Sequence, residues 1–423
     1  MPGKYNPFRP DKIVPVGMFC GRIPEIRKID HCFTQTKSGN PQHFLIEEER
    51  GIGKSSLFFI QNYVARGEIE TLDDQKVKFV TLSAVLEVGD DYYTVIKKIS
   101  DALQRELKSK EKLKDFGKKT WEFISRIEAA GLKIRDAESK IDGHQLLPNL
   151  LEDFEEIINN LQNYDGILLL IDEADQPGPD GQLGRLCKLL TEHLTFAGSE
   201  KLCIGLAGLP GLIATLRESH ASSPRLFTTM DLQPLESHEC VQVIEAGIKN
   251  AEEKGVSVEF TEDAKNFIST VSEGYPHFLQ EFSYYAYEID TDHVIDSEDV
   301  SGSLFGENGT FEQLGRKYFS TFYNAPYSDD YRKVLDTMSS HSDEWVDRAT
   351  IISESRLKDS TVDNALRALR GKNIILKNEQ KLGEYRLPTR SFAVWVRARS
   401  LAEENATSVE DAPTLFDEAE ELS

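Results

Sequence analysis

Five short apolar runs, each bounded by charged or turn-forming residues, divide the first half of the chain. Nearly unbroken runs of this kind are typical of strands that are buried on both faces of a parallel sheet. The runs cover residues 43–46, 77–82, 167–171, 202–206 and, more weakly, 227–232. Between them, apolar positions recur with helical spacing in residues 55–66, 92–107, 147–162 and 183–196. This alternation predicts an α/β fold with a parallel sheet. A charge-rich segment, residues 108–143, interrupts it and is interpreted as an inserted helix plus a hairpin.

After residue 235 the pattern becomes helical. One predicted helix covers residues 237–254 and ends before Gly255, a typical residue just beyond a helix end. Thr261 is expected to cap a second helix, and a third follows the pair Tyr275-Pro276. These helices predict a small helical domain beside the sheet.

A third pattern begins after a predicted linker at residues 301–309. Asp359 or Ser360 is expected to cap a helix that ends at Gly371. Two short apolar runs around a polar turn then predict a hairpin, with strands at residues 373–376 and 384–387. Helices followed by a hairpin are the order of a winged helix.

Charge narrows the classes of partner. The net charge of −23 argues against a general nucleic-acid coat, because phosphate binding needs a basic surface. Residues 327–400 are the exception, with fourteen Lys and Arg against eleven Asp and Glu. Residues 401–423 hold eight acids and no base, and we expect this tail to be disordered.

Cysteine usage and hydropathy indicate a cytoplasmic protein. The five cysteines contain no C-x-x-C pair, which suits small buried thiols in a reducing compartment. We find no apolar run near the ~20 residues of a membrane span and no signal-peptide core. No membrane partner is therefore expected.

The strongest chemical signal is the stretch EEERGIGKSS, residues 47–56, which follows the first predicted strand. It resembles the phosphate-binding pattern G-x-x-x-x-G-K-S/T. Gly51 and Gly53 supply the turns whose N–H groups wrap a phosphate, Lys54 neutralises the β and γ charges, and Ser55 offers its hydroxyl to Mg²⁺.

Glu48 occupies the place where the pattern has glycine. A carboxylate within ~4 Å of a phosphate charge would repel it by about 4 kcal/mol near ε ≈ 20, but by ~1 kcal/mol or less in water. A side chain at the loop entrance can face outward, and Arg50 is a candidate to screen the carboxylate, so both orientations of Glu48 stay open. We expect nucleotide binding to be weakened and not abolished.

A second element, GILLLIDEAD, covers residues 166–175. An acid at the end of a buried strand can hold Mg²⁺, and the next acid can activate an attacking water. Asp172 and Glu173 fill these two places; the alternative is an acidic cap on the following helix. The letters DEAD also suggest a helicase, but the helical chain after residue 235 does not supply the second domain that a helicase needs.

The chain resembles AAA+ ATPases of the archaeal-ATPase, STAND and origin-recognition type over about residues 10–398. Besides the two elements above, the resemblance is carried by Phe19-Cys20-Gly21-Arg22 with Glu25-Ile26, by Pro224-Arg225-Leu226-Phe227, and by Gly274-Tyr275-Pro276-His277-Phe278. It implies a nucleotide site made by Phe19, Arg22, Arg50, Gly51, Ile52, Gly53, Lys54, Ser55, Ser56, Pro276 and His277. It also implies Mg²⁺ at Ser55 and Asp172, with Glu173 and Arg225 catalytic.

This resemblance completes the predicted organisation: an α/β P-loop AAA+ sheet domain, a helical lid and a C-terminal winged helix. The predicted segments are an N-terminal linker with the adenine-side motif (1–36), the ATPase domain (37–235), the lid (236–310), the winged helix (320–400) and the tail (401–423). Arg225 would act as an arginine finger, which stabilises the charge of the transferred phosphoryl group in a neighbouring subunit. Arg217 is the other candidate for this role, and the alternative for Arg225 is an ordinary surface or capping arginine. His277 stands where many relatives carry arginine; an ordinary lid residue is its alternative.

Three departures indicate slow turnover: Glu48, His277, and a fourth strand that ends without a polar residue at residues 207–209. The first hypothesis is thus a cytoplasmic ATPase switch that binds ATP and Mg²⁺, self-associates and engages a protein partner. The second is an initiator-like or transposition-regulator-like protein that loads on DNA through Arg367, Arg370 and Lys372. The third is a nucleotide-binding scaffold without turnover.

Overall fold

The computed structural model describes residues 5–110, 113–129, 143–305, 309–314, 328–342, 344–372, 374–378, 381–390, 392–397 and 400. The chain divides into two compact units. The sheet unit is Ile13–Gln233, and the helical unit combines Met1–Lys12 with Pro234–Ser423. The chain therefore passes between the units twice, after Lys12 and after Gln233.

Five parallel strands form the centre of the sheet unit, in the order β2-β3-β4-β1-β5. Their bounds are β1 His43–Glu47, β2 Phe79–Val85, β3 Gly166–Asp172, β4 Leu202–Gly208 and β5 Phe227–Met230. All seven residues of β4 are buried, as a central strand covered on both faces requires. The predicted fold class, α/β with a parallel sheet, is confirmed.

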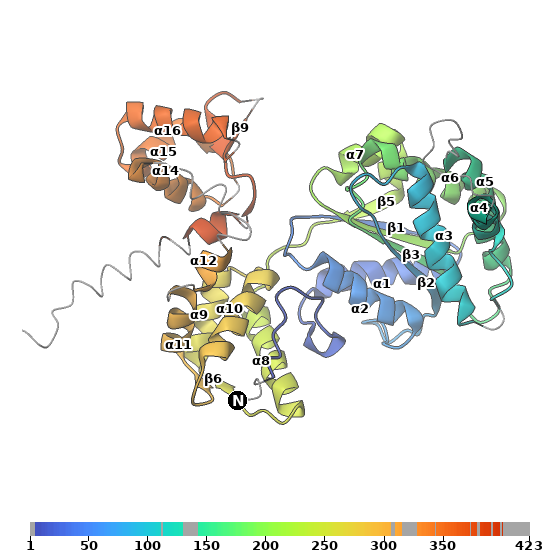
Figure 1. Cartoon of the computed structure of the whole chain (residues 1–423), viewed down its shortest axis with the longest axis horizontal. Helices are drawn as coiled ribbons and strands as arrows, with labels where there is room; N and C mark the ends of the chain where they lie inside the picture. The colour runs from blue at the N-terminus through green and yellow to red at the C-terminus, as the bar shows by residue number, and fades with distance from the viewer. Residues whose placement is uncertain are drawn as a thin grey trace, which may run out of the picture. The chain divides into compact units, whose positions relative to one another are not determined.

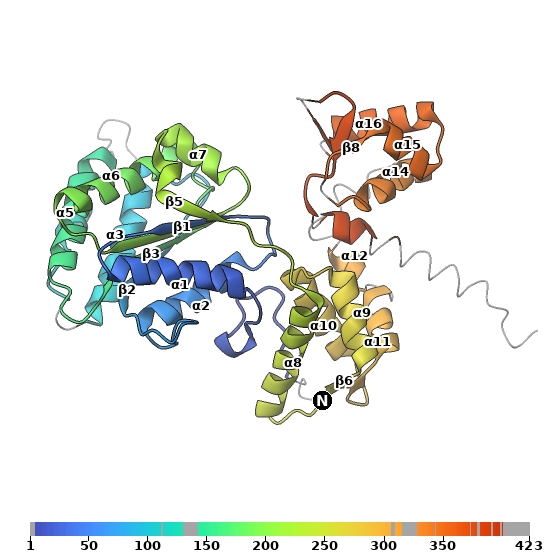
Figure 2. The ribbon, with the colours of Figure 1, turned by 180° about the vertical axis from the view of Figure 1, so that it is seen from behind.

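Helices cover both faces of this sheet. Figures 1 and 2 show α1 and α2 together on one face and α6 and α7 on the other. On the first face, the rings of Phe33, Phe44, Phe58 and Phe79 pack against one another. The helices of the unit are α1 Ile23–Lys37, α2 Lys54–Arg66, α3 Tyr92–Lys108, α4 Lys119–Ala129, α5 Gly143–Asn159, α6 Leu183–Phe196 and α7 Leu212–Ser219, with 3-10 turns at Val16–Met18, Gly178–Gly181 and Ser223–Leu226.

The inserted segment contains the predicted helix, which is α4. The hairpin was predicted without bounds, and residues 130–142 of the segment lie outside the described residues, so it stays a prediction. Helix α1 was not predicted. It begins after Arg22 in the left-handed conformation, without a side-chain cap, although Pro24 and Glu25 in its first turn are start signals that the sequence interpretation did not use.

The helical unit begins with five helices and a two-stranded parallel sheet. These are α8 Ser237–Glu253, α9 Glu262–Ser272, α10 Pro276–Ile289, α11 Ser297–Phe305, α12 Thr310–Leu314, β6 Glu259–Phe260 and β7 Val294–Ile295. The Thr261 side chain accepts the N–H of Ala264, as predicted for a cap, and Gly255 follows α8 with φ +79°. The predicted linker is wrong over residues 301–305, which belong to α11 because Val300 and Leu304 are buried one turn apart.

The C-terminal part of this unit holds several helices, including a helical segment at residues 392–397, and a three-stranded antiparallel sheet in the order β8-β10-β9. Its elements are α14 Asp329–Ser339, α15 Arg348–Ser355, α16 Asp359–Gly371, β8 Val346–Asp347, β9 Leu376–Lys377 and β10 Glu384–Arg386. The predicted hairpin is present as β9 and β10. The predicted cap is wrong: α16 starts at Asp359 without a side-chain cap, and the Asp359 carboxylate lies 3.5 Å from the Arg348 guanidinium instead.

Residues 5–12 pack as a strap inside the helical unit. The Phe8 ring is 2% exposed and lies 5.7 Å from the ring of Phe260 and 6.3 Å from that of Tyr287. The Tyr287 hydroxyl donates to the carbonyl of Tyr5 at 2.8 Å. Gly247 leaves the room for Phe8, because a β-carbon at that glycine would come within 2.5 Å of the ring.

Four of the five cysteines, Cys32, Cys187, Cys203 and Cys240, are buried free thiols, as predicted, and Cys20 is half-buried. Among the helices that the structure describes, none combines the length and the apolar character needed to cross a membrane.

Candidate phosphate-binding site

The loop between β1 and α2 has the backbone of a phosphate cradle. Gly51 and Gly53 adopt φ +84° and +102°, a region that residues with side chains rarely enter. Helix α2 begins directly at Lys54, and no side chain caps its first turn in the described structure. Its first N–H groups and its dipole thus favour an anion at this end.

Lys54 spans the loop from inside. Its ammonium donates to the backbone carbonyls of Glu48 at 2.6 Å and Glu49 at 2.7 Å. Burial lowers the pKa of Lys54, while Asp172 and Glu173 oppose this shift. The side chain is therefore already directed at the cradle, and its bonds are to carbonyls that a phosphate can replace.

Ser55 and Asp172, predicted as metal ligands, lie side by side. The Ser55 hydroxyl donates to one carboxylate oxygen of Asp172 at 2.7 Å, and the other oxygen accepts the N–H of Glu173 at 2.9 Å. Such oxygen donors fit Mg²⁺, which takes one or two protein oxygens and completes its shell with water and phosphate. Within the described residues, no group of three or more His, Cys, Asp or Glu could hold a metal ion.

Glu173 follows the end of β3 in a strained conformation, with φ +52°. Left-handed residues other than glycine are uncommon and cluster at functional sites. The carboxylate is half-buried, and in the described structure no hydrogen bond to it is formed. A carboxylate is chemically able to accept a proton, and the catalytic role predicted for Glu173 stays a prediction.

Asp175 is a residue of this site that the sequence interpretation missed. Its carboxylate accepts the N–H of Leu209, just beyond β4, at 2.8 Å. Gly208 is needed for this contact, because a β-carbon there would lie 2.7 Å from the carboxylate oxygen. The end of β4 has no polar side chain of its own, as predicted, but Asp175, from the turn after the neighbouring strand β3, lies against it.

Arg22 braces the tip of the loop. Its guanidinium is 6% exposed, donates to the carbonyl of Ile52 at 2.8 Å, and also donates to the carbonyl of Gln233. The nearby Phe19, predicted beside adenine, is half-buried. Of the other predicted loop residues, Arg50 is exposed and Ser56 is half-buried in the first turn of α2.

Of the two orientations open to Glu48, the structure has the one in which its side chain contacts the protein and does not point freely into water. Its carboxylate is half-buried and accepts the N–H of Leu232 at 3.1 Å. Burial raises the pKa of Glu48 to about 7, with Asp231 and Glu49 raising it further and the Leu232 N–H and Lys54 lowering it. Near neutral pH the carboxyl group is thus partly protonated, which reduces the repulsion of a phosphate.

Arg225 lies far from this loop in its own chain. It is exposed, and with His43 and Leu202, which begin β1 and β4, it lines a hollow of 460 Å³. The loop follows the carboxyl end of β1, whereas Arg225 lies beside the amino ends of β1 and β4, at the opposite end of the strands. The rival, Arg217, is exposed on α7.

The predicted lid residues belong to the helical unit. Pro276 begins α10, and Nδ1 of the half-buried His277 lies 3.1 Å from the carbonyl of Pro10 in the strap. The other ring nitrogen is 3.8 Å from the Glu281 carboxylate. The structure thus assigns His277 a contact with the strap, which the sequence interpretation did not predict.

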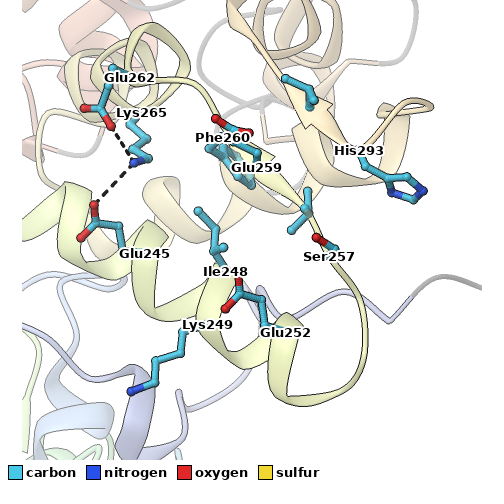
Figure 3. Close-up of a pocket in the computed structure, with 12 residues that line it drawn as sticks. Glu245, Ile248, Lys249, Glu252, Ser257, Glu259, Phe260, Glu262, Lys265 and His293 are labelled. Atoms are coloured by element: carbon cyan, nitrogen blue, oxygen red, sulfur yellow. Dashed lines mark hydrogen bonds and ion pairs between the residues drawn. The ribbon is translucent and has the colours of Figure 1, made fainter.

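The three predicted DNA-contacting residues, Arg367, Arg370 and Lys372, are all exposed on or just after α16. A separate hollow of 690 Å³ lies within the helical unit, between α8, β6 and β7. In Figure 3, Lys265 bridges Glu245 and Glu262, at 3.5 and 2.8 Å. None of the predicted site residues lines it.

No protein-family model matches the sequence. A curated protein of Methanocaldococcus jannaschii, described as an uncharacterized HTH-type transcriptional regulator, is 26% identical over 278 residues. The match covers 64% of this chain and 64% of that protein, so the chain spans less than two thirds of its relative.

Solved structures with similar folds include the Walker-type ATPase of Pyrococcus abyssi, with 14% identity over 90% of this chain and 96% of that chain, at a TM-score of 0.48. The ADP form of the Aeropyrum pernix ORC2 protein is 14% identical over 94% and 97% of the two chains, at 0.47. The Aeropyrum pernix ORC1 protein in complex with DNA is 13% identical over 93% and 94%, at 0.41. At these scores and identities, the similarities carry no argument about function.

Proposed function

We propose that this chain is an ATP-binding switch of the AAA+ type, with slow hydrolysis, whose nucleotide state controls self-association or engagement of a protein partner. One observation carries the proposal: Lys54, Ser55 and Asp172 converge beside a glycine loop and an uncapped helix start. A cation, a hydroxyl and a carboxylate in this arrangement suit a nucleotide phosphate and Mg²⁺.

Each group has a separate task in this proposal. The loop amides and Lys54 bind the phosphates, while Ser55 and Asp172 hold Mg²⁺, which offsets phosphate charge. Glu173 orients a water and takes its proton. Phe19 and Arg22 are proposed for the adenine side, and the roles of the lid residues Pro276 and His277 stay a prediction.

Arg225 supports self-association. Because it lies at the opposite end of the strands from its own loop, it can stabilise phosphoryl charge only in a second copy of the chain. Slow hydrolysis is supported by Glu48 beside the loop and by the absence of a polar side chain at residues 207–209.

Lys54→Ala tests the nucleotide site. We expect the affinity for Mg·ATP to fall about 100-fold, close to 2.7 kcal/mol, because a charge-assisted contact to phosphate is lost. Isothermal titration calorimetry of the wild type and the variant measures this change.

Lys76→Ala is the matched control, because Lys76 is an exposed lysine of the same unit. Its affinity should equal that of the wild type. Equal binding by wild type and Lys54→Ala would show that this loop is not the phosphate site.

A second candidate function, DNA binding, is favoured by the exposed cations on α16. We infer that α14–α16 and the β8-β10-β9 sheet form a winged helix that places Arg367 and Arg370 toward the phosphates or bases of a duplex. In the wing, the Arg386 guanidinium lies 4.9 Å from the centre of the Trp345 ring.

The double variant Arg367→Glu, Arg370→Glu should weaken duplex binding and reduce the slope of log affinity against log salt by about 2. The slope falls because a protein that makes two fewer phosphate contacts releases fewer counterions when it binds. Fluorescence anisotropy at several salt concentrations measures both quantities. Lys249→Glu, Lys254→Glu reverses two exposed charges on and after α8 and should leave the slope unchanged. A slope unaffected by the α16 variant would remove the DNA function.

A further inference from the structure

The last two residues of the sheet unit are both tied to the phosphate-binding loop. The N–H of Leu232 is held by the Glu48 carboxylate at 3.1 Å. The carbonyl of Gln233 is held by Arg22, whose other terminal nitrogen donates to Ile52 at 2.8 Å. Two side chains thus connect the loop to the point where the chain leaves this unit.

On the other side of this point, the chain is anchored again. Leu235 donates its N–H to the carbonyl of Gly274 at 2.8 Å. Gly274 has φ +75°, and a β-carbon there would lie 2.1 Å from the Leu235 carbonyl oxygen, so the two backbones are in direct contact. Gly274 lies two residues before Pro276, the first residue of α10. We call residues 232–235 the connector.

Glu48 is placed to respond to a phosphate in the loop. Its backbone carbonyl accepts a bond from the Lys54 ammonium at 2.6 Å, and its side chain holds the connector. A phosphate that draws Lys54 to itself takes this bond from Glu48, and its negative charge acts on the same carboxylate. Either change alters the hold on Leu232. Glycine, which the phosphate-binding pattern has at this position, could not reach Leu232 at all.

We propose that Glu48 is a positioning residue that transmits the occupancy of the phosphate-binding loop to the connector, through its bond to the Leu232 N–H. The proposal rests on the proposed function, since it takes the occupant to be a nucleotide. In this proposal the Glu48 carboxylate weakens phosphate binding somewhat, but it couples the loop to the connector, which glycine at this position could not do.

Hydrogen exchange of the Leu232 amide tests the link, measured by NMR in the full chain with and without Mg·ADP. Without nucleotide, Glu48→Ala should speed this exchange at least 10-fold. Glu48→Gln should stay near the wild type, because its amide oxygen still accepts the bond. Glu49→Ala, which removes the neighbouring charge and leaves the Leu232 contact in place, is the matched control and should also stay near the wild type.

Mg·ADP should change Leu232 exchange several-fold in the wild type and leave it unchanged in Glu48→Ala, with calorimetry showing that both proteins bind the nucleotide. If Glu48→Ala does not fold, Glu48→Met gives the same comparison, because it keeps the length of the side chain without the acceptor.

Two results would overturn the proposal: equal Leu232 exchange in wild type and Glu48→Ala, or a nucleotide-bound wild type whose Leu232 exchange does not change. A wild type that binds no nucleotide overturns the proposed function and the nucleotide response together. The nucleotide-free comparison still decides separately whether Glu48 holds the connector.

Discussion

Glu173→Gln is expected to reduce ATP turnover about 100- to 1000-fold while leaving Mg·ATP affinity within a few-fold of the wild type. Glutamine keeps the shape of the side chain but cannot take the proton of the attacking water, and general bases contribute roughly 10²- to 10⁴-fold. Because the β-carbon is retained, the strained backbone at φ +52° should persist in the variant. Single-turnover phosphate release and calorimetric binding, on the same preparations, measure the two quantities.

Asp180→Asn is the control for this comparison, because Asp180 is an exposed carboxylate of the same unit on the 3-10 turn after β3. It should leave the rate unchanged. A wild type that binds ATP without measurable turnover would support the scaffold hypothesis, and equal rates in wild type and Glu173→Gln would show that another group serves as the base.

The parallel sheet could be predicted because strands that are buried on both faces appear in the sequence as nearly uninterrupted apolar runs. Strands β3 and β4 are apolar at almost every position, so a short window of sequence suffices. The loop after β1 could be predicted for a similar reason: its glycines and Lys54 stand at fixed spacing. Helices whose buried side is narrow, such as α15 with Ile351 as its one buried residue among those described, give no comparable pattern.

The contacts that shape the site could not be predicted, because they join distant parts of the chain. Glu48 and Leu232 meet only because β1 lies between β4 and β5, which brings the segment after β5 to the mouth of the loop. Asp175 reaches Leu209 only because β3 pairs with β4. The order of strands in a sheet cannot be read from local periodicity, so the sequence interpretation left the orientation of Glu48 open.

The same strand order buries a titratable ring. His43 begins β1, is 6% exposed, and accepts the N–H of Ile204 on its Nδ1 at 3.1 Å. Its ring lies 6.0 Å from the ring of Phe227. Burial lowers the pKa of His43 to about 4. The neutral ring is thus a structural acceptor between β1 and β4.

Acid should therefore destabilise the sheet unit through His43. An unfolded histidine has a pKa of about 6.5, so between pH 6.5 and 4 the unfolded chain binds this proton and the folded chain does not. The contribution of the neutral His43 ring to the free energy of unfolding is complete above pH 6.5. About 3 kcal/mol of it is lost as the pH falls toward 4. Urea denaturation at pH 7, 6, 5 and 4 measures it.

His43→Asn isolates this contribution from the carboxylates that also titrate in acid. Asparagine can keep an acceptor near the Ile204 N–H but binds no proton, so the variant should be about 1–2 kcal/mol less stable at pH 7, because it leaves a small cavity. Its loss of stability between pH 7 and 4 should be smaller than that of the wild type by about 3 kcal/mol. His31→Asn, at an exposed position on α1, should follow the wild-type curve. Parallel curves for His43→Asn and the wild type would mean that His43 is protonated in the folded sheet unit, which the apolar surroundings of β1 and β4 oppose.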